Sequence, residues 1–435
     1  MSNFRNQAID RATLKKLLQT TISLLLFALA SQAFAQTIFI NDANVYTMGL
    51  PPQLQRADVL VRDGRIVEVG KQLQSPADAT VIEANGRKVT PGFFAGINAL
   101  GLEEISLEEP TVDQGLQWDK MRPEFDVTVA YNPQSTSIPV TRIEGYSWAM
   151  LGAGRRGSII GGTGRAVSLD GGYDSFISPP VLFIGLGAAT SALTGNTRAA
   201  QFMLLNQAMQ ESRSPVAWAP DVLLTAEGRK VLAGFVTGSG PDGVVVFAAD
   251  RASDILQVIR FAARENLPAV ISSGVEAWKV ADELAEAGIP VILDPLENLP
   301  ANFDRIGARL DNAAILNEAG VTIAFSASDE SPHNARKLRQ AAGIAVAYGL
   351  PYEAGLAGLT SHPARIFRLP EGAGTISMNA PADLVIWSGD PLEVTSRAVN
   401  VIIGGKQIPL VSRQTMLRDR YLPQNPEMPR AYIKP

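Results

Sequence analysis

The sequence contains no cysteine and only two histidines, His333 and His362, among its 435 residues. Without cysteine the chain can form no disulfide, carry no lipid on a cysteine after export, and use no thiolate as a nucleophile or metal ligand. A catalytic zinc needs three protein ligands and a water. The composition therefore excludes every zinc site that requires three or more histidine or cysteine ligands.

The first 35 residues have the pattern of a secretory signal. A basic stretch, Arg5 to Lys16, precedes an apolar run from Thr20 to Ala30 and the small-residue site Ala33-Phe34-Ala35. The apolar run is shorter than the roughly 20 residues of a bilayer-spanning helix, so an uncleaved membrane anchor is the less favoured alternative. We expect cleavage before Gln36, no stable membrane insertion afterwards, and export to the periplasm of a Gram-negative bacterium or beyond it.

The overall charge is acidic. The formal net charge of -5 becomes -8 when the signal is removed, because the signal holds four basic residues and one acid. This balance argues against nucleic acid and anionic lipid as partners. At 46% hydrophobic and 19% charged residues, the chain is long and apolar enough to bury the core of one large or two moderate domains.

Both ends of the mature chain have the alternating pattern of short strands. Residues 36–90 contain the turn pairs Asp63-Gly64 and Asn85-Gly86, which predict hairpins and hence an antiparallel sheet, and residues 370–421 contain Gly404-Gly405. We predict that the two segments form one composite β-sandwich. The Pro-rich segment 422–435 is predicted to lie loosely on the surface.

The middle segment, residues 91–369, alternates apolar strand-like runs with amphipathic helical ones. Examples are PVLFIGL, GVVVF and PAVISS on one side and ADRASDILQVIRFAAREN on the other. Repeated strand-helix units predict a parallel sheet in an α/β fold, and the length fits a (β/α)8 TIM-type barrel. An open doubly wound sheet is the alternative.

Several long segments, in order, resemble one protein family. They are RADVLVRDGRIVEVG, VTPGF, NPQSTSIPVTRIEG, LDNAAILNEAGVTIAF, HNARKLRQAAGIAVAYGLP, LTSHPARIF and ADLVIWSGDPLEVTSR. Together they resemble the amidohydrolase superfamily, and within it the imidazolonepropionase-like bacterial branch. The resemblance implies a barrel that holds zinc or another divalent metal at its strand ends and hydrolyses non-peptide or peptide-like C–N bonds.

The family's metal ligands are degenerate in this chain. Where the family carries Pro-Gly-x-x-Asp-x-His-x-His, the sequence has Ala95, Ile97 and Ala99. The resemblance places Phe247 at the histidine of the fifth strand and Ser273 near that of the sixth. Asp329 is the possible relic of the acid on the eighth strand, and one carboxylate cannot hold zinc alone. No cofactor is therefore predicted.

The two histidines, His333 and His362, each allow more than one role. His333 and Glu330 could join Asp329 as alternative ligands of a single metal, but Ser331 or Asn334 capping the following helix is the simpler interpretation. His362 fits a helix-end or packing role better than a metal site.

One glycine-rich motif resembles a dinucleotide-binding site but is not interpreted as one. LGAGRRG matches a dinucleotide fingerprint, yet no helix is predicted to open after it, so it is interpreted as a tight loop.

Three hypotheses follow for function. The chain could be a catalytically silent family member that binds a small amide-like ligand, forms a homo-oligomer or supports an active amidohydrolase paralogue as a subunit. It could be an active hydrolase with an atypical single-metal site at Asp329 and His333. It could also be a structural protein of the cell envelope.

The signal pattern makes one direct prediction. N-terminal sequencing of the exported product should begin at Gln36, because the A-x-A site follows a short apolar run. A membrane-bound product that begins at Met1 would contradict it.

Overall fold

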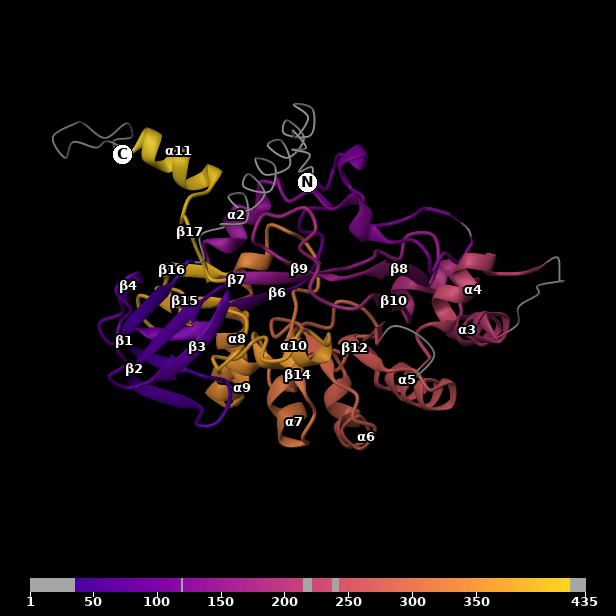
Figure 1. The fold of residues 1–435 in the computed structure, drawn as a ribbon. Helices are drawn as coiled ribbons and strands as arrows, with labels where there is room; N and C mark the ends of the chain where they lie inside the picture. The colour runs from indigo at the N-terminus through magenta and orange to yellow at the C-terminus, as the bar shows by residue number, and fades with distance from the viewer. Residues whose placement is uncertain (1–35, 119, 214–220, 237–241, 423–435) are drawn as a thin grey trace, which may run out of the picture.

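A computed structural model describes residues 36–118, 120–213, 221–236 and 242–422 (Figure 1). The signal segment 1–35 and residues 423–435 of the Pro-rich tail lie outside these ranges, so both remain predictions. In the described ranges, no helix is both long and apolar enough to cross a membrane.

Strands from the two ends of the chain form one eight-stranded sheet in the order β17-β16-β15-β5-β1-β2-β3, with β4 also paired to β1. The strands are β1 (Ile38–Tyr46), β2 (Gln53–Arg62), β3 (Arg65–Gly70), β4 (Thr80–Glu83), β5 (Lys88–Pro91), β15 (Leu384–Trp387), β16 (Ala398–Ile403) and β17 (Lys406–Ile408). The antiparallel pair β5–β15 joins the two segments. This sheet encloses its own apolar cluster, and Figure 1 shows the indigo and yellow strands side by side.

Of the two turn pairs in residues 36–90, one closes the predicted hairpin and the other does not. Asp63 and Gly64 both have positive φ, 54° and 77°, and close the antiparallel β2–β3 hairpin. Asn85 and Gly86 also have positive φ, but β4 and β5 both pair with β1 in parallel. The Gly86 N–H donates to Asp42 O (2.7 Å), so this turn spans an irregularity in β1 and makes no hairpin.

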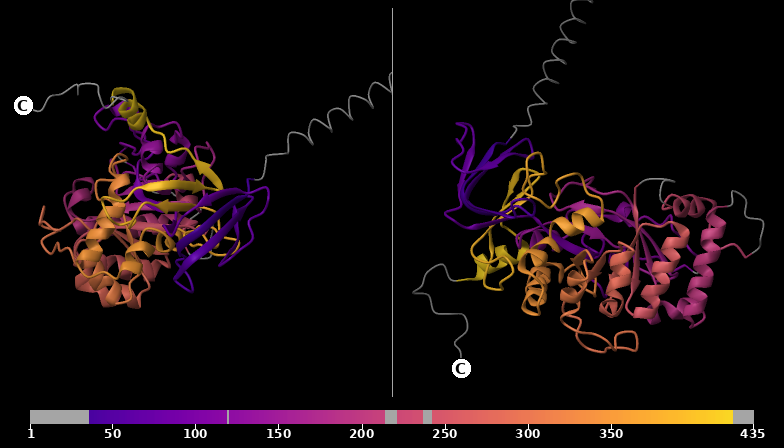
Figure 2. Two further views of the ribbon diagram at one scale, coloured as in Figure 1. Left: turned by 90° about the vertical axis from the view of Figure 1, so that its left-hand side faces the viewer. Right: turned by 90° about the horizontal axis from the view of Figure 1, so that it is seen from below.

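The middle segment contains two further sheets with helices beside them (Figure 2). One has the order β14-β13-β12-β11-β10-β8 and the other β6-β7-β9. The strands are β6 (Phe93–Asn98), β7 (Tyr146–Leu151), β8 (Ile160–Gly164), β9 (Ala166–Ser168), β10 (Val181–Gly185), β11 (Val244–Ala249), β12 (Ala269–Ser273), β13 (Val291–Leu293) and β14 (Ile323–Phe325). The α-helices are α2 (Ser137–Arg142), α3 (Arg198–Ser212), α4 (Ala226–Ala233), α5 (Ala252–Glu265), α6 (Ala281–Glu286), α7 (Asn312–Glu318), α8 (Leu338–Ala347), α9 (Tyr352–Ala357), α10 (Ser361–Ile366) and α11 (Arg413–Tyr421).

The mixed α/β class is confirmed, but strand pairing among the described residues does not close a (β/α)8 barrel. Strands β10 to β14 are parallel, as predicted, whereas β8 is antiparallel to β10 and β9 is antiparallel to β7. Between β14 and β6 a loop takes the place of direct pairing. The Phe325 N–H donates to Gly358 O (3.3 Å) and the Phe94 N–H donates to Leu359 O (2.7 Å).

A buried arginine connects the middle segment to the end sheet. Arg339 of α8 is 2% exposed and donates to the carbonyl oxygens of Pro391, Glu393 and Ser396 at 3.0, 2.7 and 2.7 Å. These carbonyls belong to the connection between β15 and β16. The guanidinium also lies over the Trp387 ring, 5.5 Å from its centroid. The planar guanidinium of arginine suits this site, because the single ammonium group of a lysine could not reach three fixed acceptors in this way.

We expect Arg339→Met to destabilise the fold by about 3 kcal/mol, because two buried carbonyls and one part-buried carbonyl lose a charged donor. Urea denaturation of the mature protein measures this change. The control is Lys337→Met, two residues earlier and exposed, which should change the free energy of unfolding by less than about 0.5 kcal/mol. Equal stability of the two variants would show that Arg339 does not hold the two parts together.

Candidate functional site

A polar cluster lies where the parallel strands β11 and β12 end. The carboxyl ends of parallel strands meet at one edge, which is where α/β folds place their sites. Asp250 directly follows β11, Ser273 ends β12, and Arg305 comes from the connection after β13. Arg305 Nε lies 2.8 Å from Asp250 Oδ2 and its Nη2 lies 3.5 Å from Ser273 Oγ. A fixed guanidinium therefore connects the two strand ends.

Arg305 is charged at every accessible pH. Burial acts to lower its pKa, but the carboxylates of Asp250 and Glu297 more than offset this and raise the pKa above its ordinary value. Glu297 Oε1 lies 3.0 Å from Arg305 Nη1. The second oxygen of Asp250, Oδ1, is buried and has no hydrogen-bond partner among the described residues.

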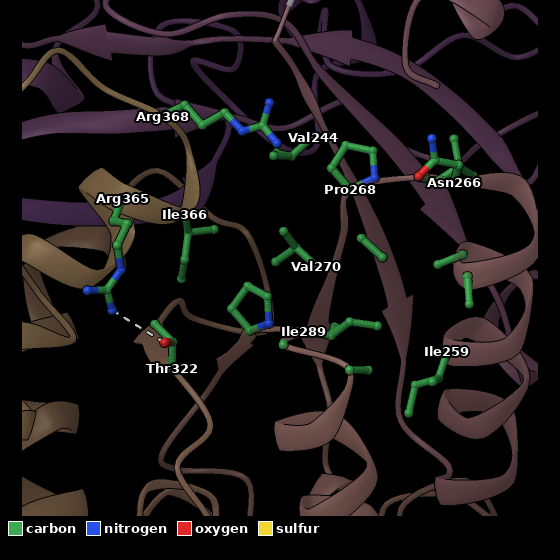
Figure 3. A pocket seen from close by; sticks show the side chains of 17 residues that line it. Val244, Ile259, Asn266, Pro268, Val270, Ile289, Thr322, Arg365, Ile366 and Arg368 are labelled. Carbon is green, nitrogen blue, oxygen red and sulfur yellow. Dashed lines mark hydrogen bonds between the residues drawn. The ribbon is translucent and has the colours of Figure 1, made fainter. Parts of the chain in front are cut away.

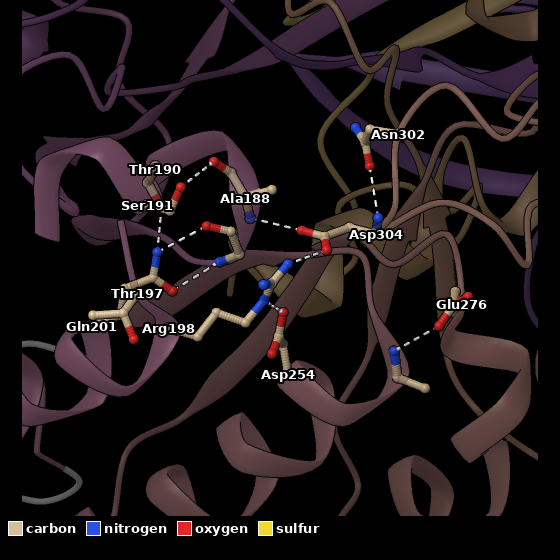
Figure 4. Close-up of polar contacts among 12 residues, drawn as sticks. Ala188, Thr190, Ser191, Thr197, Arg198, Gln201, Asp254, Glu276, Asn302 and Asp304 are labelled. Carbon is tan, nitrogen blue, oxygen red and sulfur yellow. Dashed lines mark hydrogen bonds and ion pairs between the residues drawn. The ribbon is translucent and has the colours of Figure 1, made fainter. Parts of the chain in front are cut away.

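The connection from β13 to α7, residues 294–311, folds over this strand edge, and we call it the capping loop. Its Asp304 accepts a hydrogen bond from the Ala188 N–H (2.7 Å) and pairs with Arg198 (Figure 4). Arg198 Nε also pairs with Asp254 of α5 at 3.0 Å. Asp254 is buried, which raises its pKa, and the charge of Arg198 opposes that rise.

A second buried acid holds the capping loop from the β12 side. Glu276 Oε1 accepts from the Gly307 N–H (3.0 Å) and from Lys279 Nζ (2.6 Å). Its other oxygen accepts from the Ala252 N–H (3.2 Å). Burial acts to raise the pKa of Glu276, but these donors outweigh it and the pKa is lowered. The acidic side chains at this edge therefore accept hydrogen bonds from backbone N–H groups or form ion pairs with basic side chains.

The three residues that the sequence resemblance aligns with the family's first metal ligands lie in an apolar setting. Ala95, Ile97 and Ala99 are all at most 3% exposed. Strand β6 is irregular here, with Gly96 at φ 89°. The Ile97 N–H donates to Ser326 Oγ (3.0 Å), and this hydroxyl donates back to Ile97 O (3.2 Å). Ser326, a polar residue ending an apolar strand, connects the ends of β14 and β6 and was missed in the sequence.

Phe247 packs on the helix side of β11. Its ring meets Phe261 of α5 edge to face, with centroids 6.2 Å apart. Alternation along a strand then directs Val246 and Ala248 to the opposite side, and the next polar residue in that series is Asp250. From the sequence, Phe247 and Ser273 were predicted to lie at or near the family's histidine positions on these strands. The structure brings Ser273 to Asp250 and Arg305, two residues that sequence reasoning missed.

The loop after β14 separates the residues that were considered as alternative ligands. Asp329 and His333 are both exposed. Asp329 accepts from the Ser331 N–H (3.1 Å), and His333 Nδ1 lies 2.7 Å from Ser331 Oγ. Glu330 instead pairs with Arg155 (3.3 Å). Asp329 and His333 thus have partners in their own turn, whereas Glu330 is bonded to residues of distant segments.

The predicted helix cap in this loop was wrong. The 3-10 helix η5 (Ala335–Lys337) has Asn334 at its N-cap position, but no side chain caps it. Asn334 Nδ2 instead donates to Asp329 Oδ2 (2.5 Å). Asp329 therefore stabilises its own turn.

His362 has the packing role that its sequence context suggested. Its Nδ1–H donates to Ile323 O at 2.8 Å, and burial lowers the pKa of the imidazole. The ring is neutral at physiological pH and serves the packing of α10 on β14.

The residues present do not fit the family's zinc. Across residues 36–118, 120–213, 221–236 and 242–422, no group of three or more histidine, cysteine, aspartate or glutamate side chains is placed to hold a metal ion. Zinc needs at least three such ligands within about 2.3 Å. No reaction step through a metal is derived for this site.

A pocket of about 470 Å³ lies at the opposite, amino ends of β11 to β13 (Figure 3). Its walls are mainly apolar, and its two arginines have partners. Arg365 Nη2 donates to Thr322 Oγ1 (3.3 Å), and Arg368 pairs with Asp242. Parallel α/β sheets bind ligands at the carboxyl ends of their strands, so the capping-loop edge remains the candidate functional site.

The amidohydrolase family profile matches residues 190–408, and the chain belongs to the amidohydrolase family. The structure resembles an amidohydrolase from Thermotoga maritima MSB8, with a TM-score of 0.76 and 25% identity over 86% of this chain and 100% of that one. A prolidase complexed with N-methylphosphonate-L-proline has a TM-score of 0.53 at 15% identity over 86% and 99% of the two chains, which shows a shared fold alone.

One curated relative shares a short stretch. The amidohydrolase tasK of Hapsidospora irregularis is 36% identical over 91 residues, which are 21% of this chain and 9% of that protein. The chain thus spans less than a tenth of that relative.

We expect Arg305→Met to loosen the capping loop, because it leaves Asp250 and Glu297 without their cation. Each lost charged hydrogen bond is worth about 1.5–3 kcal/mol, so amide hydrogen exchange in the loop should accelerate by roughly tenfold or more. Exchange measured by mass spectrometry tests this. Phe303→Ala is the control in the same loop, since the Phe303 side chain is 88% exposed. Similar exchange in both variants would contradict this role of Arg305.

Proposed function

We propose that the protein is an exported amidohydrolase-family binding protein that does not catalyse the family's metal-dependent hydrolysis of C–N bonds. The observation that carries the proposal is the guanidinium of Arg305 between Asp250 and Ser273. These positions end β11 and β12, the strands on which the family resemblance implies metal-binding histidines.

A guanidinium at this edge is incompatible with the family's route for a physical reason. It has five donors and no acceptor, so it offers no lone pair to a metal. Its fixed positive charge also repels a divalent cation, by several kcal/mol at about 4 Å even with the screening typical of a protein surface. Asp250 and Glu297, the acids that could have attracted a cation, already neutralise Arg305.

We also propose that the middle segment has the fold of a TIM-type barrel. We infer that β6 to β14 form a distorted TIM-type barrel in which residues 160–168 supply one antiparallel strand. The support is that β8 pairs with β10 while β9 pairs with β7, so this one segment connects the two sheets. The loop at Gly358 and Leu359 then links β14 to β6. The imidazolonepropionase-like branch rests on the sequence resemblance.

The alternatives have weaker support. An active single-metal hydrolase would bring Asp329 and His333 to one ion, yet each is exposed and bonded to a neighbour in its own turn. A structural role in the envelope has no specific observation in its favour. The periplasm as location, a small amide-like ligand, and a homo-oligomer or an active paralogue as partner remain parts of the binding proposal.

The test is the metal content and activity of freshly purified mature protein. Elemental analysis after gel filtration should find less than about 0.1 equivalent of zinc, because no three ligands converge among the residues that the structure describes. The protein should not hydrolyse dipeptides or cyclic amides. The opposite result has a clear signature: about one equivalent of zinc, with amidase activity lost both on chelation and in Asp329→Asn, would establish the enzyme instead.

A further inference from the structure

A second pocket lies at the junction of the β6-β7-β9 sheet and the end sheet. It has a volume of about 360 Å³ and contains no residue of the capping loop. We call it the β7 pocket. The residues that matter here are Ser147, Trp148, Asp170, Phe176 and Asp383.

The floor of the β7 pocket contains a buried hydroxyl without a partner. Ser147 is 0% exposed, and among the described residues its Oγ has no hydrogen-bond partner. The hydroxyl lies against the backbone of Gly92, where an added Cβ would come within 2.2 Å of it. Buried polar atoms in folded proteins nearly always have a partner, so an orphaned hydroxyl facing a cavity points to an atom supplied by a ligand.

Two carboxylates line the same pocket as this hydroxyl. Asp383 uses Oδ1 to accept from the Gly404 N–H (2.7 Å), and Asp170 uses Oδ1 to accept from the Gly172 N–H (2.8 Å). In the described ranges neither acid forms an ion pair. Arg142 interacts electrostatically with Asp170, and its Nη1 donates to Leu169 O. Burial raises the pKa of Asp383 to about 6, and the negative charge of Asp170 adds to this.

The shape and walls of the β7 pocket indicate an organic ligand. Trp148 and Phe176 line it together with the apolar residues Ile177, Leu369, Pro370 and Pro381. The acids are not grouped as metal ligands, because the described residues contain no cluster of three placed around one ion. A ligand that satisfies all these surfaces has a positive donor at one end and carbon at the other.

We propose that the β7 pocket binds a small organic ammonium ion, whose N–H groups donate to Asp170, Asp383 and Ser147 Oγ while its carbon part contacts Trp148 and Phe176. An ammonium has the three donors that these three acceptors require. The aromatic walls favour a cation with an apolar body. This site goes beyond the proposed function, because it holds whether or not the capping-loop edge is catalytic.

The probe is 2-phenylethylammonium, titrated calorimetrically into the mature protein. We expect saturable binding at one site, no binding of the uncharged 2-phenylethanol, and a dissociation constant about tenfold higher in Asp383→Asn. Asp383→Asn should fold, because its amide oxygen still accepts from Gly404 and an unpaired buried charge is removed. Ser147→Ala should weaken binding severalfold with no loss of thermal stability.

The matched control is Asp242→Asn, an exposed acid at the amino-end pocket, which should bind like the wild type. Absence of saturable binding by the wild type would overturn the proposal, as would equal binding by Asp383→Asn. Binding of calcium chloride without binding of the ammonium would show a simple ion site and would also overturn it. Zinc content is measured separately, so failure of this proposal is distinct from failure of the proposed function.

Discussion

The two parts of this protein depend on one buried guanidinium. Arg339 donates to the carbonyl oxygens of Pro391, Glu393 and Ser396 in the connection between β15 and β16, where the Ser396 N–H is a second donor to Glu393 O. The same residue is tied to the middle segment, since its N–H donates to the hydroxyl of Tyr146 on β7 (2.7 Å). Trp387 extends this contact inward, because its ring stacks on Phe93 of β6 and its indole N–H donates to Thr90. The position of β6 and β7 relative to the end sheet follows from these contacts.

The carboxyl edge of the parallel strands balances its acidic side chains with basic side chains. Carboxylates gathered in one place repel one another unless a cation balances them. Here Arg198, Lys279 and Arg305 supply the positive charge. Arg198 and Arg305 also hold the capping loop through Asp304, Asp250 and Glu297.

The sequence predicted the elements well and their connections less well. Apolar runs such as GVVVF and PAVISS became β11 and β12 because buried parallel strands are apolar on both faces. The pairs Asp63-Gly64 and Asn85-Gly86 look alike in sequence, yet only the first closes a hairpin, since the pairing of β4 and β5 with β1 decides the second. At the site, Ser273 was named, but Arg305 is more than thirty residues further along the chain and no local pattern marks it. Such ion pairs form through tertiary contacts, which sequence periodicity does not report.

The joining of β5 to β15 has a consequence for how the chain reaches its native state. Thr90 pairs with Val385, so nearly three hundred residues must be in place before this ladder can form. Closing so long a loop costs entropy before any contact rewards it, and folding slows as the sequence separation of contacts grows. β5 is the amino-terminal strand whose edge stays unpaired until β15 arrives, because β1 already pairs with β2, β4 and β5. Until then this edge is open to pairing with another chain.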